Sequence, residues 1–191
     1  MRYATPIILL KYLQYYLKGS NSKGHGVHSP FVYKFIREDL NANKSSEELM
    51  IHDPALKQRL AEINSVLSGH LPEKIKKLIV LMIDKWKPAS FYISGEGSGS
   101  NTTLEAAADF VFLGASSLKD SVLSKAVNLI DMMHPNSLLV LEGIHSSSVM
   151  EQTWDAVKKN PKTRLTIDLF FIGLVFCRTE QKEQEHFIIR Y

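Results

Sequence analysis

Apolar residues recur along this chain with two different spacings, and the spacing changes near residue 88. Before that point, apolar side chains return every three or four residues, which is the spacing of one face of an α-helix. Each such segment carries a proline in its first turn, where the missing N–H is tolerated. The sequence predicts four helices there, over residues 5–17, 29–40, 53–67 and 72–86.

After residue 90, apolar runs of four to six residues alternate with longer amphipathic segments. This alternation favours parallel strands joined by crossover helices. Three strand-like runs with only short polar gaps end the chain, and they predict an antiparallel C-terminal edge on a mostly parallel sheet. Strands are predicted near residues 90–94, 109–113, 137–142, 164–171, 174–178 and 186–191, and helices near 101–107, 118–133 and 147–160.

The pattern therefore predicts an α/β protein in two parts. Residues 1–87 form a helical N-terminal extension packed on the core, and residues 88–191 form a Rossmann-like α/β core. At 191 residues and 45% hydrophobic content, the chain is long enough for one such unit with a sizeable core.

Glycine occupies alternate positions directly after the first predicted strand, at Gly95, Gly97 and Gly99. A helix is predicted to follow, with Asn101 or Thr102 as its N-cap. Glycines without Cβ atoms let a ligand approach the backbone, and the first N–H groups of a helix favour an anionic group. The segment suits a nucleotide or nucleoside cofactor, although an exposed loop rich in glycine and serine has the same composition.

Three related sites are excluded by residue type. A phosphate-binding loop needs Lys followed by Ser or Thr after its last glycine, and here Ser100-Asn101 follows. A hydrolase nucleophile elbow needs Gly-x-Ser-x-Gly, and position 97 is glycine instead. A dinucleotide site needs an acid at the end of the next strand, where this chain has Gly114.

Charge is modest overall but uneven. The formal net charge is +3, and residues 1–44 carry seven Lys or Arg against Glu38 and Asp39, so that this arm holds +5 and the remainder −2. A basic arm can bind nucleic acid or an anionic membrane, but it is more commonly a solvated helix face, which is the interpretation favoured here. We therefore expect no nucleic-acid partner and no membrane partner.

One cysteine, Cys177, lies in an apolar run and can form no internal disulfide. A cytoplasmic location is expected from this cysteine usage and from the absence of a segment of about 20 apolar residues. Cys177 is expected to act as a small buried hydrophobic residue rather than as a catalytic thiol.

Several stretches resemble the class I S-adenosylmethionine-dependent methyltransferases, and among them a bacterial branch with a helical N-terminus. The most specific are His-Gly-Val-His-Ser-Pro-Phe-Val-Tyr at residues 25–33 and Glu-His-Phe-Ile-Ile-Arg-Tyr at residues 185–191. Further similar stretches occur in the same order between them, at residues 71–72, 87–88, 109–113, 144–154 and 166–176. The resemblance covers most of the chain.

The resemblance implies a seven-stranded sheet whose last strand is reversed. It also implies S-adenosylmethionine as cofactor, with its methionine part bound at the glycine loop by Gly95, Glu96, Gly97 and Gly99. Glu96 is suited to contact the cofactor's ammonium group, and an exposed loop acid remains an equal alternative.

This chain departs from the family where the cofactor's acids should stand. Ile93 replaces the usual acid of the first strand, Gly114 replaces the acid after residues 109–113, and the paired acids before Ile144 are reduced to Glu142 and Gly143. Only residues 100–108 separate the glycine loop from the next strand, where the family has two further strands with their helices. The sequence therefore predicts a truncated methyltransferase sheet that lacks the adenosine half of the pocket.

Two residues remain as catalytic candidates, Glu142 at the end of a predicted parallel strand and His145 three residues later. Open α/β sheets place their sites at this edge, and His145 can serve as a base or join Glu142 in a metal site. His25 and His28 have a spacing that can ligate metal, but beside glycine and a helix cap they are expected to bond to backbone groups. No metal site is predicted.

Two functions remain compatible with these features of the sequence. The first is a degenerate methyltransferase-like protein that acts through protein interaction, either with itself or with another protein, because a shortened sheet exposes an edge that must be paired or covered. The alternative is an active S-adenosylmethionine-dependent O-methyltransferase on a small molecule, with its missing pocket rebuilt by another subunit or by the N-terminal helices.

Overall fold

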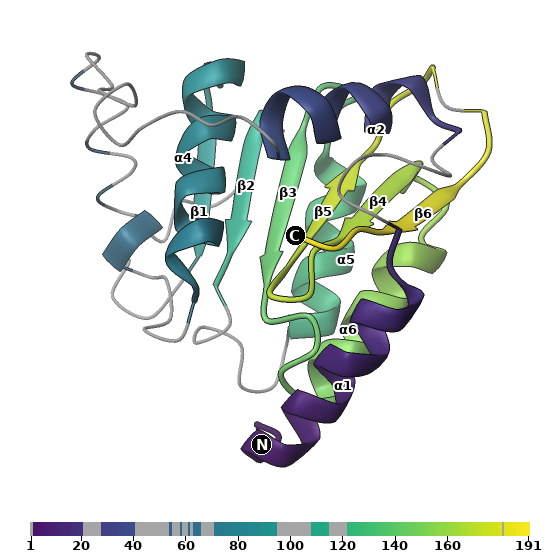
Figure 1. Cartoon of the computed structure of the whole chain (residues 1–191). Coiled ribbons are helices and arrows are strands. Elements are labelled where there is room, and N and C mark those ends of the chain that lie inside the picture. The colour runs from purple at the N-terminus through teal and green to yellow at the C-terminus, as the bar shows by residue number, and fades with distance from the viewer. Residues whose placement is uncertain are drawn as a thin grey trace.

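Helices cover both faces of a single six-stranded sheet in the computed structural model (Figure 1). The structure describes residues 2–20, 28–40, 54, 58, 61, 63–65, 71–94, 108–114, 122–180 and 182–191. The glycine loop, the helix predicted at 101–107, most of the helix predicted at 53–67, and His25 lie outside the described residues. The expectation of an α/β protein with a mostly parallel sheet is confirmed.

The strands lie in the order β1-β2-β3-β5-β4-β6. β1, β2 and β3 are parallel to one another, and β4 is parallel to β6. β5 is the reversed strand, and it lies between β3 and β4, antiparallel to both. The antiparallel pairings thus fall in the C-terminal part of the sheet as predicted, while β6 forms the outermost pairing in the parallel sense. The strands are Phe91–Ser94 (β1), Phe110–Leu113 (β2), Leu138–Glu142 (β3), Leu165–Asp168 (β4), Ile172–Phe176 (β5) and Glu185–Ile188 (β6).

The central strands are mostly apolar because both of their faces are covered. Every residue of β2, β3, β4 and β5 is buried. Alternate side chains enter two different cores: Phe112 and Val140 pack under the N-terminal helices, whereas Leu113 and Leu141 pack under α5 and α6.

The N-terminal helices pack directly on the sheet. α2, η1 and α4 share one apolar core with it, and α5 and α6 cover the other face (Figure 1). The helices predicted at 5–17, 72–86 and 147–160 are confirmed within two residues. Within the helix predicted at 29–40, the last turn is a π-helix. The helices are Thr5–Lys18 (α1), Pro30–Phe35 (α2), Ile36–Leu40 (η1), Glu73–Trp86 (α4), Val122–Met132 (α5) and Ser148–Lys159 (α6).

α1 stands apart from the other N-terminal helices. Ser20, just after it, forms a parallel bridge with Ile189, and the Tyr15 hydroxyl donates a hydrogen bond to the Ile189 carbonyl. α1 therefore runs along the side of the molecule where β6 ends (Figure 1). Within the described part of the chain, no helix has both the length and the apolar character needed to cross a membrane.

β1 forms the other edge of the sheet. Among the described residues, β1 pairs with β2 and with no further strand. Its burial is correspondingly lower, since Phe91 and Tyr92 are only half-buried, whereas every residue of β2 is buried. No strand of the described residues lies on the free side of β1.

Candidate functional site

The candidate site lies at the carboxyl edge of the parallel strands. β1 ends at Ser94, β3 at Glu142 and β4 at Asp168, and because these strands run in the same direction, their ends lie along one edge. Ligands of open α/β sheets bind at this edge. Gly95, Glu96, Gly97 and Gly99 follow β1 but lie outside the described residues, so their role in cofactor binding stays a prediction.

The turn after β3 brings Glu142 and His145 to one cavity of about 340 Å³. Gly143 adopts a φ of 71°, a conformation that strains any residue with a Cβ. Its N–H donates to the Phe171 carbonyl at 2.7 Å, and its own carbonyl accepts from the N–H of Ser146 at 2.9 Å. Glycine at position 143, where the family has an acid, is thus required by the turn that this chain forms.

His145 is held between two carboxylates. Its Nε2 lies 2.7 Å from Asp168 Oδ2, and its Nδ1 lies 3.6 Å from Glu151 Oε1. Both ring nitrogens therefore face acids of the same chain. Asp168 orients the imidazole through a hydrogen bond and thereby gives His145 a structural role, while the separation from Glu151 is too long for a hydrogen bond, and a catalytic role for His145 stays a prediction.

Phe170 forms the wall behind His145. Its ring stacks on the imidazole with centroids 5.2 Å apart and an interplanar angle of 25°. The backbone of Phe170 has a φ of 66°, which is unusual for any residue other than glycine. Its N–H donates a hydrogen bond to Asp168 Oδ1 at 2.8 Å. Asp168 thus holds both the strained turn between β4 and β5 and the imidazole that packs on it.

Glu151 ties α1 to this cluster. It accepts hydrogen bonds from Tyr3 Oη at 2.9 Å and from Lys11 Nζ at 2.6 Å. Partial burial acts to raise the pKa of Glu151, but the hydrogen bonds from Lys11 and Tyr3 outweigh it, and the pKa is lowered. The same hydrogen bond raises the pKa of Lys11.

Asp109, which belongs to a stretch resembling the family, serves the opposite edge of the sheet. Its Oδ2 accepts from the backbone N–H groups of Ala89 and Ser90, each at 2.9 Å, and its Oδ1 lies 2.9 Å from His134 Nε2. Desolvation acts to raise the pKa of Asp109, yet these hydrogen bonds lower it. The carboxylate therefore fixes the entry into β1 rather than contacting the candidate site.

Two residues of this site, Glu142 and His145, were predicted from the sequence, and five were not: Asp168, Glu151, Lys11, Tyr3 and Phe170. Asp168 carries the same signal as Glu142, an acid at the end of a buried strand, and could have been found that way. Glu151, Lys11 and Phe170 carry no such signal, because they reach the site only through the packing of α1, α6 and the β4–β5 turn. Glu142 itself is only 1% exposed at the wall of the cavity.

The described residues at the ends of β1 and β2 offer no carboxylate to a cofactor. Ile93 is buried, Ser94 Oγ accepts from Lys125 Nζ at 2.6 Å, and the Gly114 N–H donates to the Ser94 carbonyl at 2.9 Å. The described part of the chain also contains no group of three or more His, Cys, Asp or Glu residues placed to hold a metal, and His28 is exposed. Comparison of the chain with protein-family models, with curated proteins and with solved structures found no match.

Proposed function

We propose that this chain is an S-adenosylmethionine-dependent methyltransferase-like protein whose cofactor pocket is degenerate and which acts through protein interaction. The observation that carries this proposal is the edge position of β1. Among the described residues, β1 has a partner on one side only, and it presents Ile93 and Ser94 where the resembling family has an acid.

Energetics support the loss of cofactor binding. A charge-assisted hydrogen bond contributes about 1.5 to 3 kcal/mol, so the loss of two or three moves a cofactor affinity from micromolar to millimolar or weaker. One strand of six, β5, is reversed, but a further strand, β6, follows it in the parallel sense, whereas the resemblance implies that the last strand is the reversed one.

An active O-methyltransferase on a small molecule is the second candidate. The cavity of about 340 Å³ at the carboxyl edge favours it, because Glu142 and Tyr3 line a space in the size range of small-molecule sites. Methyl transfer requires mainly alignment of the two substrates, so the structural role of His145 does not count against this candidate.

Calorimetric titration with S-adenosylmethionine and S-adenosylhomocysteine separates the two. We expect no heat of binding up to millimolar ligand from a sample that unfolds cooperatively. Micromolar binding that is lost in Gly97→Val would overturn the degenerate-pocket proposal and establish the enzyme. Val149→Ala, on an exposed position of α6, is the control for nonspecific effects of substitution.

The surface suited to protein interaction is the outward face of α1. Leu10, Leu13 and Leu17 are 57%, 54% and 75% exposed, whereas the inward face holds Tyr15, which is 5% exposed. Surface leucines are ordinary when scattered, but a continuous apolar stripe on one helix marks an interface. α1 therefore turns its more apolar side away from the sheet.

The partner that this stripe fits is a second copy of the chain. Leu10, Leu13 and Leu17 are spaced three and four residues apart, which is the repeat that packs knobs into holes against an identical helix. Lys11 lies on the other side, bound to Glu151, so that no charge lies within the seam. A two-fold pairing of one patch with itself is also the commonest symmetry of soluble oligomers.

Sedimentation at increasing protein concentration tests this pairing. We expect a dimer at high concentration and a shift to monomer in Leu13→Glu, because the pairing would bury two charges. Val149→Glu places the same charge on an exposed apolar position of α6 and should leave the dimer intact. A wild-type chain that stays monomeric from micromolar to near-millimolar concentration would rule out the α1 pairing.

A further inference from the structure

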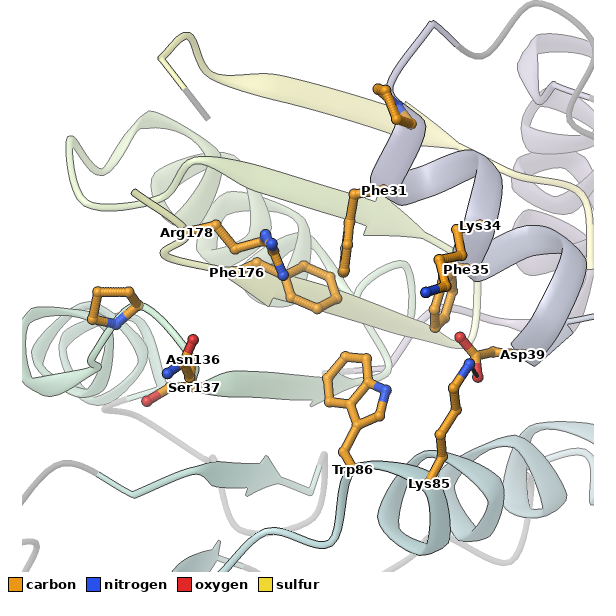
Figure 2. Close-up of a pocket in the computed structure, with 12 residues that line it drawn as sticks. Phe31, Lys34, Phe35, Asp39, Lys85, Trp86, Asn136, Ser137, Phe176 and Arg178 are labelled. Carbon is orange, nitrogen blue, oxygen red and sulfur yellow. Dashed lines mark ion pairs between the residues drawn. The ribbon is translucent and has the colours of Figure 1, made fainter. Parts of the chain in front are cut away.

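A second, larger cavity of about 630 Å³ lies at the amino edge of the parallel strands, away from His145 (Figure 2). Ser137, directly before β3, and Phe176, at the end of the reversed strand β5, lie on one side of it. Trp86, at the end of α4, and Phe31, in α2, lie on the other. Neither Glu142 nor His145 reaches this cavity, so it is separate from the candidate site at the carboxyl edge.

Three aromatic rings form its walls. The rings of Phe31 and Phe176 meet edge to face, with their centroids 5.2 Å apart. The ring centroids of Trp86 and Phe176 are 5.8 Å apart. Figure 2 shows the three rings converging on the middle of the cavity from α2, α4 and β5. Such surfaces take up a planar ring by stacking or edge contact, and such aromatic contacts contribute beyond the area they bury.

Arg178 stands at the mouth. Its guanidinium lies 4.2 Å from the centroid of the Phe31 ring, and its only ion pair among the described residues is at 3.6 Å to Glu180, whose side chain is 68% exposed. Lys34 lies across the cavity, on the side of Asp39 (Figure 2). Exposed pairs like that of Arg178 are weak and exchange readily for a ligand's anion.

The far end of the cavity is closed by an internal ion pair. Asp39, 5% exposed, is bound by Lys85 at 2.9 Å, and the π-helical turn Ile36–Leu40 carries it inward. π-helical turns inside helices occur frequently at functional sites. Lys85 is also bound by Glu38 at 3.0 Å, so the acids at this end of the cavity balance the cations there, and Arg178 is the cation paired only with an exposed acid.

We propose that this cavity binds a planar aromatic molecule that carries an acid group. The ring lies against Phe31, Trp86 and Phe176, and the acid group takes the place of Glu180 at Arg178. A bidentate contact to the guanidinium fits a carboxylate or a phosphate. A neutral ring lacks the second anchor, and an aliphatic acid lacks the first. This inference needs neither the cofactor nor the pairing of α1.

Titration calorimetry with six probes tests it. Indole-3-acetate and adenosine 5′-monophosphate carry a ring with a carboxylate and with a phosphate, and they distinguish these two sources of the acid. Indole-3-acetamide and adenosine are their neutral counterparts, and acetate and inorganic phosphate are the acids without a ring. We expect at least one ring acid to bind about tenfold more tightly than its neutral counterpart and its ringless acid.

Variants assign the binding to this cavity. Arg178→Gln should remove the preference for the acid, while Arg178→Lys should retain part of it. Trp86→Phe should keep binding but abolish any quenching of indole fluorescence by adenosine 5′-monophosphate, since the chain's other tryptophan, Trp154, is buried against Gly173 on the opposite face. Lys158→Gln on α6 removes an equal charge elsewhere and should change nothing.

Three results would overturn the proposal. The first is no binding of either ring acid up to millimolar concentration by a cooperatively folded sample. The second is equal affinity for acid and neutral counterpart. The third is an acid preference that persists unchanged in Arg178→Gln. Thermal unfolding of each variant checks that the fold is retained, and Arg178→Lys keeps the test valid if Arg178→Gln does not fold.

Discussion

A lysine–carboxylate pair lies at the carboxyl edge of the parallel strands and another at their amino edge. The pKa of the acid is shifted in opposite directions in the two pairs. At the carboxyl edge, Lys11 binds Glu151 at 2.6 Å, and at the amino edge Lys85 binds Asp39 at 2.9 Å. Burial acts to raise the pKa of both acids. It is outweighed at Glu151 by hydrogen bonds from Lys11 and Tyr3, whereas at Asp39 it prevails over Lys85, so that the pKa of Asp39 is raised.

The difference shows which edge holds the fold and which edge is available to a ligand. Around His145, donors and acceptors of α1, α6 and the β4–β5 turn satisfy one another, and their interactions fasten α1 to the sheet. Around Trp86, Arg178 is paired only with the exposed Glu180, at 3.6 Å. A polar cluster that is internally paired stabilises structure, while a weakly paired charge beside apolar walls favours binding.

Removal of Asp168 should have the largest effect on this comparison. Asp168→Ala leaves the Phe170 N–H and the His145 ring without their acceptor while the strained φ of Phe170 remains. A buried group without its partner costs about 1 to 3 kcal/mol, so we expect a loss of about 3 kcal/mol in the free energy of unfolding. Denaturant unfolding followed by circular dichroism measures it.

Two further variants test the reason for that loss. Asp168→Asn keeps an oxygen for the Phe170 N–H and an amide for His145, so about 1 kcal/mol should be lost. Asp155→Ala removes an exposed acid from an i,i+3 pair and should change stability by less than about 0.5 kcal/mol. If Asp168→Ala were no more costly than Asp155→Ala, the carboxyl edge would not be a self-satisfied cluster.

Much of the fold was readable from spacing alone, because burial imposes the spacing. Ile75, Leu78, Ile79 and Met82 recur at helical intervals and all enter the core beneath α4. The uninterrupted apolar run of β3 likewise indicates a strand covered on both faces. The position of β5 in the sheet was harder to predict from the sequence. It depends on the tight turn at Phe170, where a positive φ occurs at a residue that is not glycine.

The candidate site was only half predictable for the same reason. Glu142 and His145, predicted at the carboxyl edge of the sheet, line one cavity there because the ends of parallel strands share an edge, and their catalytic role stays a prediction. The contacts of His145 were not predictable, since Asp168 and Glu151 approach it from other elements, β4 and α6, through tertiary packing. The cavity lined by Arg178 and Trp86 could not be predicted from any sequence pattern, because its lining residues come from four separate regions of the chain.

The smallest predicted effect is an opposite change in acid sensitivity at the two edges. Glu151 has a pKa below its ordinary value of 4.5, so its stabilisation is complete above that value and is lost as the pH falls through the lowered folded-state pKa. Asp39 has a pKa above its ordinary value of 3.8, so acidification through the raised folded-state pKa down to 3.8 stabilises the fold.

Glu151→Gln should therefore reduce the loss of stability in acid, and Asp39→Asn should increase that loss. Each change should be less than about 1 kcal/mol because solvent screens these pairs. Glu73→Gln, at a side chain that is 75% exposed, is the control. Unfolding free energies measured from neutral pH to about pH 3 decide the matter, and a change of the same sign in both variants would show that burial and hydrogen bonding are not balanced differently at the two edges.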